Sequence, residues 1–134
     1  RASFQNFSFN FDSAAGIIYT VDVTKPKGEK ITIISMADGT PFSMDKMYKV
    51  ALNSYRGNGG GELLTKGAGI PQDELKGRIL FSTDKDLRYY LMQYIEKKGV
   101  IEPHALGQWK FIPEEWVEPA AKRDYEYLFG KVEK

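Results

Sequence analysis

Apolar and polar residues alternate with a period of two through much of the first half of the chain, the pattern of half-buried strands. Residues 4–11 alternate aromatic and polar side chains and favour a strand over a loop held in place by its aromatic rings. Residues 17–23 carry Ile, Tyr, Thr and Val, which strands prefer. A turn containing Pro and Gly at 25–30 leads into residues 31–36, so the two runs predict an antiparallel hairpin.

A glycine-rich segment follows one more predicted strand. Residues 47–52 alternate loosely between Lys and apolar types and predict that strand, after which the chain reads NSYRGNGGGE. The glycines allow positive φ angles and let the backbone approach a ligand closely. Tyr55 adds a flat aromatic ring, and Asn58 adds two hydrogen-bond donors and an acceptor. The segment therefore predicts either a ligand-binding loop or a flexible surface turn.

The second half of the chain changes to a helical period. Apolar side chains recur at i, i+3, i+4, i+7 and i+8 from Leu87, namely at Leu87, Tyr90, Leu91, Tyr94 and Ile95. This spacing predicts a helix over residues 84–98. Thr83 is expected to cap its first turn, with Asp86 three residues later completing a capping box. A shorter helix is predicted at residues 71–76.

The end of the chain mixes charged and aromatic residues. Residues 108–112 predict a last short strand, which Pro113 would end. Tyr125, Leu128 and Phe129 predict one face of a closing helix. Together the elements indicate an α+β fold, in which helices pack on a mixed β-sheet with hairpins.

Composition narrows the possible functions. The 134 residues predict a single domain over 1–134, and no apolar run is long enough to span a bilayer. Nineteen basic and eighteen acidic residues give a net charge of +1, so we expect no nucleic-acid partner. The chain has no Cys, which excludes disulfides and thiolate metal sites. Because it opens with Arg1 rather than Met, we expect a fragment or a processed product.

The residues needed for catalysis are scarce. The spacings of nucleoside-triphosphate and dinucleotide phosphate loops are missing from the glycine-rich segment. His104 is the single His and lies near no Ser motif, so its expected role is structural or solvated. Asp84 and Asp86 are two residues apart, which puts them on different sides of a helix and predicts partners of the helix dipole. We therefore predict no catalytic residue, metal site or cofactor in this chain.

Two side chains of the glycine-rich segment are candidates for ligand contact. Tyr55 lies where the predicted strand becomes the loop, and there its ring can stand free to stack on a planar ligand. Arg56 is a candidate contact for an anion, although an Arg beside Gly is more often solvated. The other Tyr residues, including those of the predicted helix, are expected to anchor the core.

The order of these motifs resembles the C-terminal domain of the 5'-nucleotidase, UDP-sugar hydrolase and 2',3'-cyclic phosphodiesterase family. The resemblance rests on residues 15–31 (AGIIYTVDVTKPKGEKI), residues 48–55 (YKVALNSY) and Asn58, Gly59 and Gly60. It covers about residues 11–112 and leaves 113–134 as a C-terminal extension. The combination of motifs is specific, whereas each one alone is weak.

The resemblance implies a two-domain phosphoesterase that works in nucleotide catabolism. An N-terminal metallophosphoesterase domain, absent from this chain, would carry a two-metal centre of divalent ions and hydrolyse phosphate esters of nucleotides. The C-terminal domain would hold the nucleoside or other leaving group, so this fragment alone would not be catalytic. On this basis Tyr55 matches the aromatic residue that stacks on the base, and Asn58, Gly59 and Gly60 match the loop beside the ligand. The resemblance also implies a periplasmic, secreted or cell-surface location.

Two departures from the family pattern affect the site. The family loop usually continues Gly-Gly-Asp-Gly, with the Asp available to ribose hydroxyls, but here Gly61 stands at that position and Glu62 follows it. In addition, the chain begins after the family region that would supply arginines and the opposing aromatic of the base sandwich. A fold truncated at its N-terminal side, with weak nucleotide affinity, is therefore expected.

Two alternatives remain beside the nucleotide hypothesis. In the first alternative, the parent enzyme acts on another phosphate ester, such as a cyclic nucleotide or a nucleotide sugar, for which the changed loop leaves room. Alternatively, the domain is a non-catalytic binding or structural module of a cell-envelope protein. Upstream sequence with or without the Asp, His and Asn ligands of a two-metal site separates these classes.

Overall fold

A computed structural model describes residues 11–130 of the chain. These residues form two compact units, the sheet unit (11–46 and 105–130) and the loop unit (47–104). The sheet unit contains β1 (Ile17–Asp22), β2 (Ile31–Met36), β3 (Trp109–Ile112) and α3 (Glu114–Phe129). The loop unit contains α1 (Ser54–Gly57), η1 (Gly60–Glu62), η2 (Leu63–Gly67), η3 (Leu75–Arg78) and α2 (Leu87–Lys98). The expected single domain over 1–134 stays a prediction.

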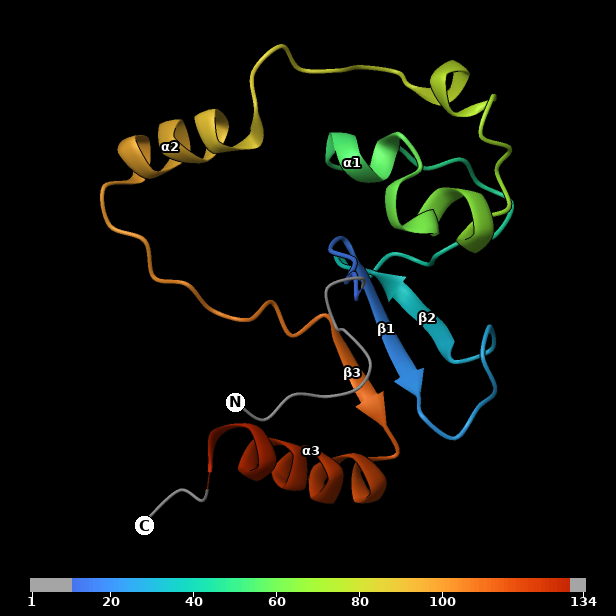
Figure 1. Ribbon diagram of the computed structural model, residues 1–134, viewed down its shortest axis with the longest axis vertical. Coiled ribbons are helices and arrows are strands. Elements are labelled where there is room, and N and C mark those ends of the chain that lie inside the picture. Colours follow the sequence, from blue (N-terminus) through green and yellow to red (C-terminus); the bar gives the residue numbers. More distant parts are fainter. Residues whose placement is uncertain (1–10, 131–134) are drawn as a thin grey trace. The chain divides into compact units, whose positions relative to one another are not determined.

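The sheet unit contains a three-stranded mixed sheet in the order β2-β1-β3 (Figure 1). β1 pairs with β2 in antiparallel fashion, with Ile17 opposite Met36, and the register shifts between Ile18 and Tyr19. The turn between these strands closes through the Glu29 amide, which donates to the Pro26 carbonyl at 3.2 Å. The predicted hairpin and the α+β fold class are therefore confirmed.

β3 joins the sheet from the other end of the chain. It runs parallel to β1, with Tyr19 opposite Trp109 and Asp22 opposite Ile112. The sequence predicts this strand at 108–112, and in the structure it begins one residue later, at Trp109. The pairing of this strand with β1 could not be predicted from the local pattern, because parallel strands are joined by a long crossover connection that no local pattern encodes.

The core of the sheet unit is built around Tyr19 on the central strand. Its side chain is 6% exposed, and its ring stacks on Trp109 with centroids 6.0 Å apart. Phe111 packs edge-on against Trp109, with their centroids 5.1 Å apart, and Phe11 lies 5.7 Å from the same indole. The Tyr19 hydroxyl accepts a hydrogen bond from the Ala14 amide at 3.1 Å. Tyr19 therefore has both an apolar environment and a polar partner, as a buried tyrosine requires.

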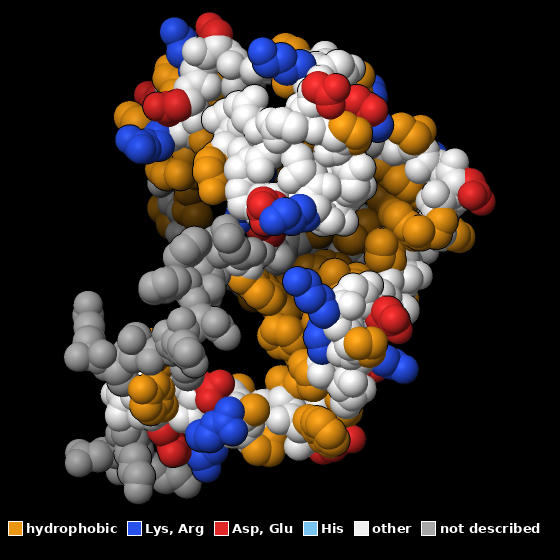
Figure 2. All heavy atoms as spheres, turned by 45° about the vertical axis from the view of Figure 1, so that its right-hand side comes forward, with side chains coloured by type: hydrophobic (Ala, Val, Ile, Leu, Met, Phe, Trp, Pro, Cys, Tyr) orange, Lys and Arg blue, Asp and Glu red, His pale blue; other side chains and the backbone are white. Residues whose placement is uncertain are grey.

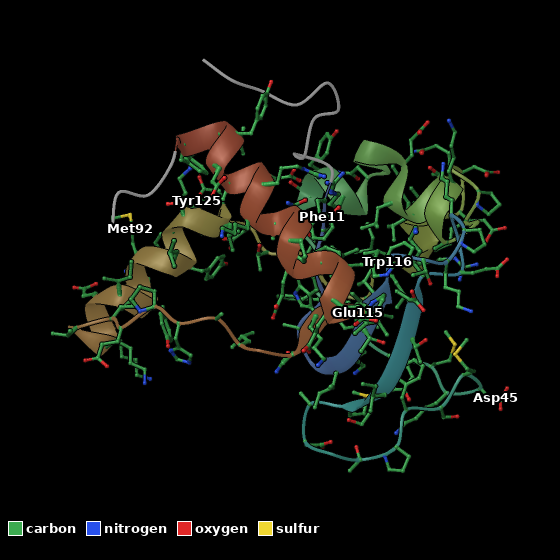
Figure 3. The ribbon with its side chains drawn as sticks, turned by 90° about the horizontal axis from the view of Figure 1, so that it is seen from below. Phe11, Asp45, Met92, Glu115, Trp116 and Tyr125 are labelled. Atoms are coloured by element: carbon green, nitrogen blue, oxygen red, sulfur yellow. The ribbon has the colours of Figure 1, made fainter. Side chains whose placement is uncertain are left out.

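Helix α3 confirms the predicted closing helix and makes it longer. It begins directly after Pro113 and carries Glu114 and Glu115 in its first turn, where acidic groups favour the helix dipole. The rings of Tyr125 and Phe129 lie 4.9 Å apart on its last turns. Figure 3 shows Glu115 and Trp116 on this helix, together with Tyr125. Helix α3 contacts β3, so the strand and the helix form one continuous end of the sheet unit.

Helix α2 confirms the strongest helical prediction, but its cap differs from the expected one. Asp86, and not Thr83, is the N-cap: its carboxylate accepts from the Tyr89 amide at 3.0 Å. The Thr83 hydroxyl instead donates to the Lys85 carbonyl at 3.1 Å. An Asp directly before the helix satisfies the free amides of the first turn, so the capping role moves three residues along the chain.

Two other predictions for the loop unit are wrong or shifted. Residues 47–52 form no strand, because they are not paired into the described sheet, and a strand needs a paired neighbour. The predicted helix at 71–76 appears as a turn followed by η3, whose bounds are Leu75–Arg78. The predicted strand at 4–11 lies almost wholly outside the described residues.

Exposed apolar side chains are common in the part of the chain that is described (Figure 2). The residues expected to form the buried face of α2 are themselves 39% to 72% exposed: Leu87, Tyr90, Leu91, Tyr94 and Ile95. Their spacing predicts the helix correctly, but burial of that face is not observed. Between residues 11 and 130, no helix is long and apolar enough to cross a membrane.

Candidate functional site

The glycine-rich segment forms a series of short helical turns in place of an open loop. Asn53 starts it: its side-chain oxygen accepts from the Arg56 amide at 2.8 Å and so caps α1. The Gly57 amide donates to the Asn53 carbonyl at 2.9 Å, and the Asn58 amide donates to Ser54 at 3.0 Å. These local bonds give residues 53–58 a defined conformation, so the alternative of a flexible surface turn is not favoured.

Tyr55 presents its ring to solvent. The side chain is 61% exposed, and the guanidinium carbon of Arg56 lies 5.3 Å from the ring centroid, within cation–π range. Part of the ring lies against the backbone of Gly60: a Cβ on Gly60 would lie 2.6 Å from Tyr55 Cδ2 and Cε2. Glycine at position 60 thus lets the chain pass beside the ring. The ring is held in place while much of its surface stays accessible, as stacking requires.

Arg56 is buried, contrary to the solvated alternative. Its side chain is 7% exposed, and Nη1 donates to the Gly60 carbonyl at 3.2 Å. The guanidinium therefore links the start of the segment to its glycines, because a planar group with five donors can hold backbone carbonyls. Direct contact between Arg56 and a ligand stays a prediction.

The glycines at 59 and 61 adopt left-handed backbone conformations, with φ angles of 94° and 67°. Residues with a Cβ rarely take these angles, which explains why glycine occupies both positions. Glu62 has a φ of 59° and is the exception with a side chain. Its carboxylate lies 2.7 Å from Lys66 Nζ, and both side chains are more than half exposed. Glu62 is thus paired at the surface, and Gly61 offers no acid.

Gln72 is a member of this site that sequence reasoning missed. Its Nε2 donates to the Asn58 carbonyl at 3.1 Å from a turn 14 residues further along the chain. The same amide fills the space beside Gly59, where a Cβ would lie 2.5 Å from Gln72 Oε1. The sequence gives no signal for it, because the pattern around residue 72 indicates only a short helix.

The predicted site residues are close together in the structure. Tyr55, Arg56, Asn58, Gly59 and Gly60 form one cluster through the hydrogen bonds and close approaches above, and Gly61 directly follows them. A contact to a ligand stays a prediction for each of them.

His104, Asp84 and Asp86 make separate local contacts. His104 is exposed, and its Nδ1 lies 3.2 Å from the Glu102 carbonyl. Asp84 accepts from the Tyr90 hydroxyl at 3.4 Å, and Asp86 caps α2. Across residues 11–130, no group of three or more His, Asp or Glu side chains is placed to hold a metal ion.

The carboxylates with shifted pKa values lie in the sheet unit and not beside Tyr55. The Thr24 hydroxyl and amide lower the pKa of Asp22 by donating to its carboxylate at 2.6 and 2.9 Å. Thr40 lowers the pKa of Asp38 in the same way. The hydrogen bond from Lys110 lowers the pKa of Glu114. Asp38 and Glu114 are exposed and Asp22 is partly exposed, and all three carboxylates stabilise turns or a helix end.

Comparison with known proteins supports the resemblance seen in the sequence. The 5'-nucleotidase C-terminal domain family matches residues 3–66, which include the segment from Asn53 to Lys66. The trifunctional nucleotide phosphoesterase protein YfkN of Bacillus subtilis is 31% identical over 121 residues, covering 81% of this chain. A 2',3'-cyclic-nucleotide 2'-phosphodiesterase/3'-nucleotidase of Haemophilus influenzae is 26% identical over 121 residues, covering 79% of this chain.

The match covers a small part of each relative. This chain spans 8% of the length of the Bacillus protein and 17% of the Haemophilus protein. No solved structure matches the chain. The resemblance recognised from the motifs is nevertheless confirmed: the family model of the 5'-nucleotidase C-terminal domain matches the region that carries Tyr55 and its glycines.

Proposed function

We propose that this chain is the substrate-binding domain of a nucleotide phosphoesterase and that the segment 53–62 forms one wall of the leaving-group site. The observation that carries the proposal is the Tyr55 ring, which is 61% exposed although Arg56 and Gly60 hold it in place. An aromatic ring fixed in this way can stack on a nucleobase with little loss of conformational entropy. The family match over the same residues supports a nucleotide as the ligand.

In this proposal each part of the segment has a distinct role. Tyr55 stacks on the base, and the Asn58 side chain supplies donors and an acceptor to its polar edge. The glycines bring the backbone close to the sugar, because no Cβ keeps it away. Within residues 11–130, no cluster of three or more His, Asp or Glu side chains is placed to hold a metal ion. On the basis of the family resemblance, the bond-breaking residues and the two metal ions are assigned to another domain of the intact protein.

The residue at position 61 favours substrates that carry phosphate on a ribose 2' or 3' oxygen. An acid at this position would accept hydrogen bonds from free ribose hydroxyls, but it would repel a phosphate attached to the same oxygens. Gly61 removes that repulsion, and Glu62 is paired with Lys66. The name of the Haemophilus relative, a 2',3'-cyclic-nucleotide 2'-phosphodiesterase/3'-nucleotidase, is in line with this choice.

A panel of phosphate esters tests the substrate class. The intact protein is assayed with Mn²⁺ or Mg²⁺ on 2',3'-cyclic AMP, 3'-AMP, 5'-AMP and UDP-glucose. We expect higher kcat/KM for the first two esters. The Gly61→Asp variant should lose activity on 2',3'-cyclic AMP more than on 5'-AMP. Equal loss on both esters, or a preference of the parent protein for 5'-AMP, would contradict the role given to Gly61.

Substitution of Tyr55 tests the stacking contact itself. Tyr55→Ala should weaken nucleotide binding by about 1–3 kcal/mol, the range for loss of one base-stacking ring. Tyr55→Phe keeps the ring and should bind like the parent protein. Tyr94→Ala is the matched control, because it removes another exposed Tyr ring, 53% exposed on α2. Unchanged KM and kcat in Tyr55→Ala would exclude the stacking role.

The same assays separate the enzyme from a non-catalytic module. A module would bind no nucleotide and hydrolyse none of the four esters, whatever metal is added. A periplasmic, secreted or cell-surface location is part of the proposal and rests on the family resemblance alone. Fractionation of cells that express the intact protein checks it, and recovery of the protein in the cytosol would contradict it.

A further inference from the structure

Gln72 contacts the candidate site from outside the glycine-rich segment. Its Nε2 donates to the Asn58 carbonyl at 3.1 Å, and its Oε1 occupies the space beside the Gly59 Cα. Both contacts fall on the residues that connect α1 to η1, where the chain turns back toward the Tyr55 ring. One side chain thus meets the segment at two neighbouring residues.

The turn that carries Gln72 is itself fixed in place. The Ile70 amide donates to the Leu64 carbonyl at 3.0 Å, just before this turn. The Glu74 amide donates to Pro71 at 3.0 Å and closes the turn. Leu75 follows and is 4% exposed, which makes it one of the buried residues of the loop unit. Gln72 therefore extends from a turn that is anchored on both sides, and can act as a fixed support for the segment.

We propose that Gln72 is a positioning residue for the leaving-group site, a role that rests on the function proposed above. By holding the Asn58 carbonyl, Gln72 fixes the turn that places the Asn58 side chain. Through the adjacent Gly59 it also fixes Gly60, whose backbone lies against the Tyr55 ring. Gln72 itself need not touch the ligand. It restricts the segment to the conformation that binds, which lowers the entropy cost of binding.

Steady-state kinetics of the intact protein provide the main test. Gln72→Ala and Gln72→Glu both remove the donor to Asn58, and each should raise KM by about two- to fivefold, the range for one exposed hydrogen bond. The value of kcat should stay the same, because the reacting atoms lie elsewhere. Gln72→Lys retains a donor and should restore KM at least in part. Gln93→Ala, which removes an exposed Gln on α2, is the matched control.

Whether the Gln72 substitutions change KM or kcat distinguishes a positioning role from a merely structural one. A variant that unfolds in part lowers the active fraction, and this lowers the apparent kcat while KM stays constant. If Gln72→Ala changes kcat alone, or changes neither parameter, the proposal is wrong. If the Tyr55→Ala variant is impaired while Gln72→Ala equals the parent protein, the function stands and only the role of Gln72 is overturned.

A second measurement needs no substrate. Gly59→Ala should be more disruptive in the parent than in the Gln72→Ala background, because the new Cβ meets Gln72 Oε1 only when Gln72 is present. Hydrogen exchange of the amides at 58–62 reports the effect. Gln72→Ala alone should raise their exchange rates, and the double variant should show less than the sum of the single effects. Unchanged exchange in Gln72→Ala, or strictly additive effects, would overturn the proposal even if the protein binds no nucleotide.

Discussion

The sheet unit and the loop unit are stabilised by contacts of different range along the chain. In the sheet unit, β1 pairs with β3, and the Gly16 amide donates to Gln108 Oε1 across 92 residues. In the loop unit, the contacts that shape the candidate site join near neighbours, such as Arg56 with Gly60 and Gln72 with Asn58. The sheet unit therefore depends on residues far apart in the chain, whereas the candidate site is formed largely by residues close together in the sequence.

The sheet and the turns around Tyr55 are expected to differ in stability. Long-range strand pairing couples distant residues, so we expect the sheet to unfold as one cooperative element. The turns around Tyr55 depend on local bonds and few buried side chains, which is typical of regions that open with a small free energy. Ligand-binding segments are commonly of this kind. The two units should thus respond separately to substitution, and the four variants below test that expectation.

The largest effect is expected from Tyr19→Ala in the sheet unit. It removes a ring that is 6% exposed and stacked on Trp109, together with the hydroxyl that accepts from Ala14. Loss of a buried aromatic side chain should lower the free energy of unfolding by about 3–5 kcal/mol. Urea unfolding followed by Trp fluorescence measures it. Tyr94→Ala is the control, and a similar loss in both variants would show that Tyr19 is not the core of the unit.

The next effect is expected from Leu75→Ala in the loop unit. Leu75 is 4% exposed, and truncation of a buried Leu costs about 2–5 kcal/mol. Hydrogen exchange should show faster exchange across residues 54–78, with the amides of β1 unchanged. Leu80→Ala, at a side chain that is 76% exposed, is the control. Equal acceleration in β1 would contradict the separate stability of the two units.

Sequence reasoning succeeds where the pattern is local and fails where a partner decides the structure. The spacing of Leu87 to Ile95 identifies α2, and the turn at 25–30 identifies the hairpin, because helix faces and turns are encoded by near neighbours. Residues 47–52 have the composition of a strand, yet they lie outside the described sheet. A strand pattern indicates that a segment can form a strand, but it does not indicate which strand it pairs with.

The candidate site was predictable in its members but not in its geometry. Tyr55, Asn58 and the glycines stand out because an aromatic ring and an amide beside consecutive glycines are an uncommon combination. The buried position of Arg56 and the support from Gln72 were not predictable. Both depend on contacts that these side chains make with the backbone of other residues in the folded chain, and no residue type indicates those contacts in advance.

A smaller effect is expected from Gly60→Ala, which tests the packing beside Tyr55. The new Cβ would lie 2.5 Å from the Tyr55 carbonyl oxygen and 2.6 Å from its ring, so the segment must shift. We expect a loss of about 1–3 kcal/mol in stability, the usual cost of overpacking, and weaker nucleotide binding. Gly57→Ala is the matched control, because a Cβ there meets nothing within 4 Å. If both variants behave alike, the contact between Gly60 and Tyr55 has no role.

The smallest expected effect is a change in the stability of the sheet unit with pH. The pKa of Asp22 is lowered from its ordinary value of 3.8, mainly by the Thr24 hydroxyl. The folded state therefore binds this proton less readily than the unfolded state, so the stabilisation is present above pH 3.8. It is lost as the pH falls below that value and through the lower pKa of the folded state. Because the carboxylate is exposed, the change should be small.

The Thr24→Val variant isolates this effect of pH. It removes the hydroxyl that lowers the pKa of Asp22 while it keeps the backbone amide and a β-branched side chain. We expect the difference in urea midpoint between the parent chain and Thr24→Val to shrink as the pH is lowered from 6 to 3. Thr24→Ser retains the hydroxyl and should follow the parent chain. The glycine-rich segment has no part in this turn, so the nucleotide binding proposed for Tyr55 should keep the same pH profile in both variants. A change in that profile with Thr24→Val would contradict the separate response of the two units to substitution.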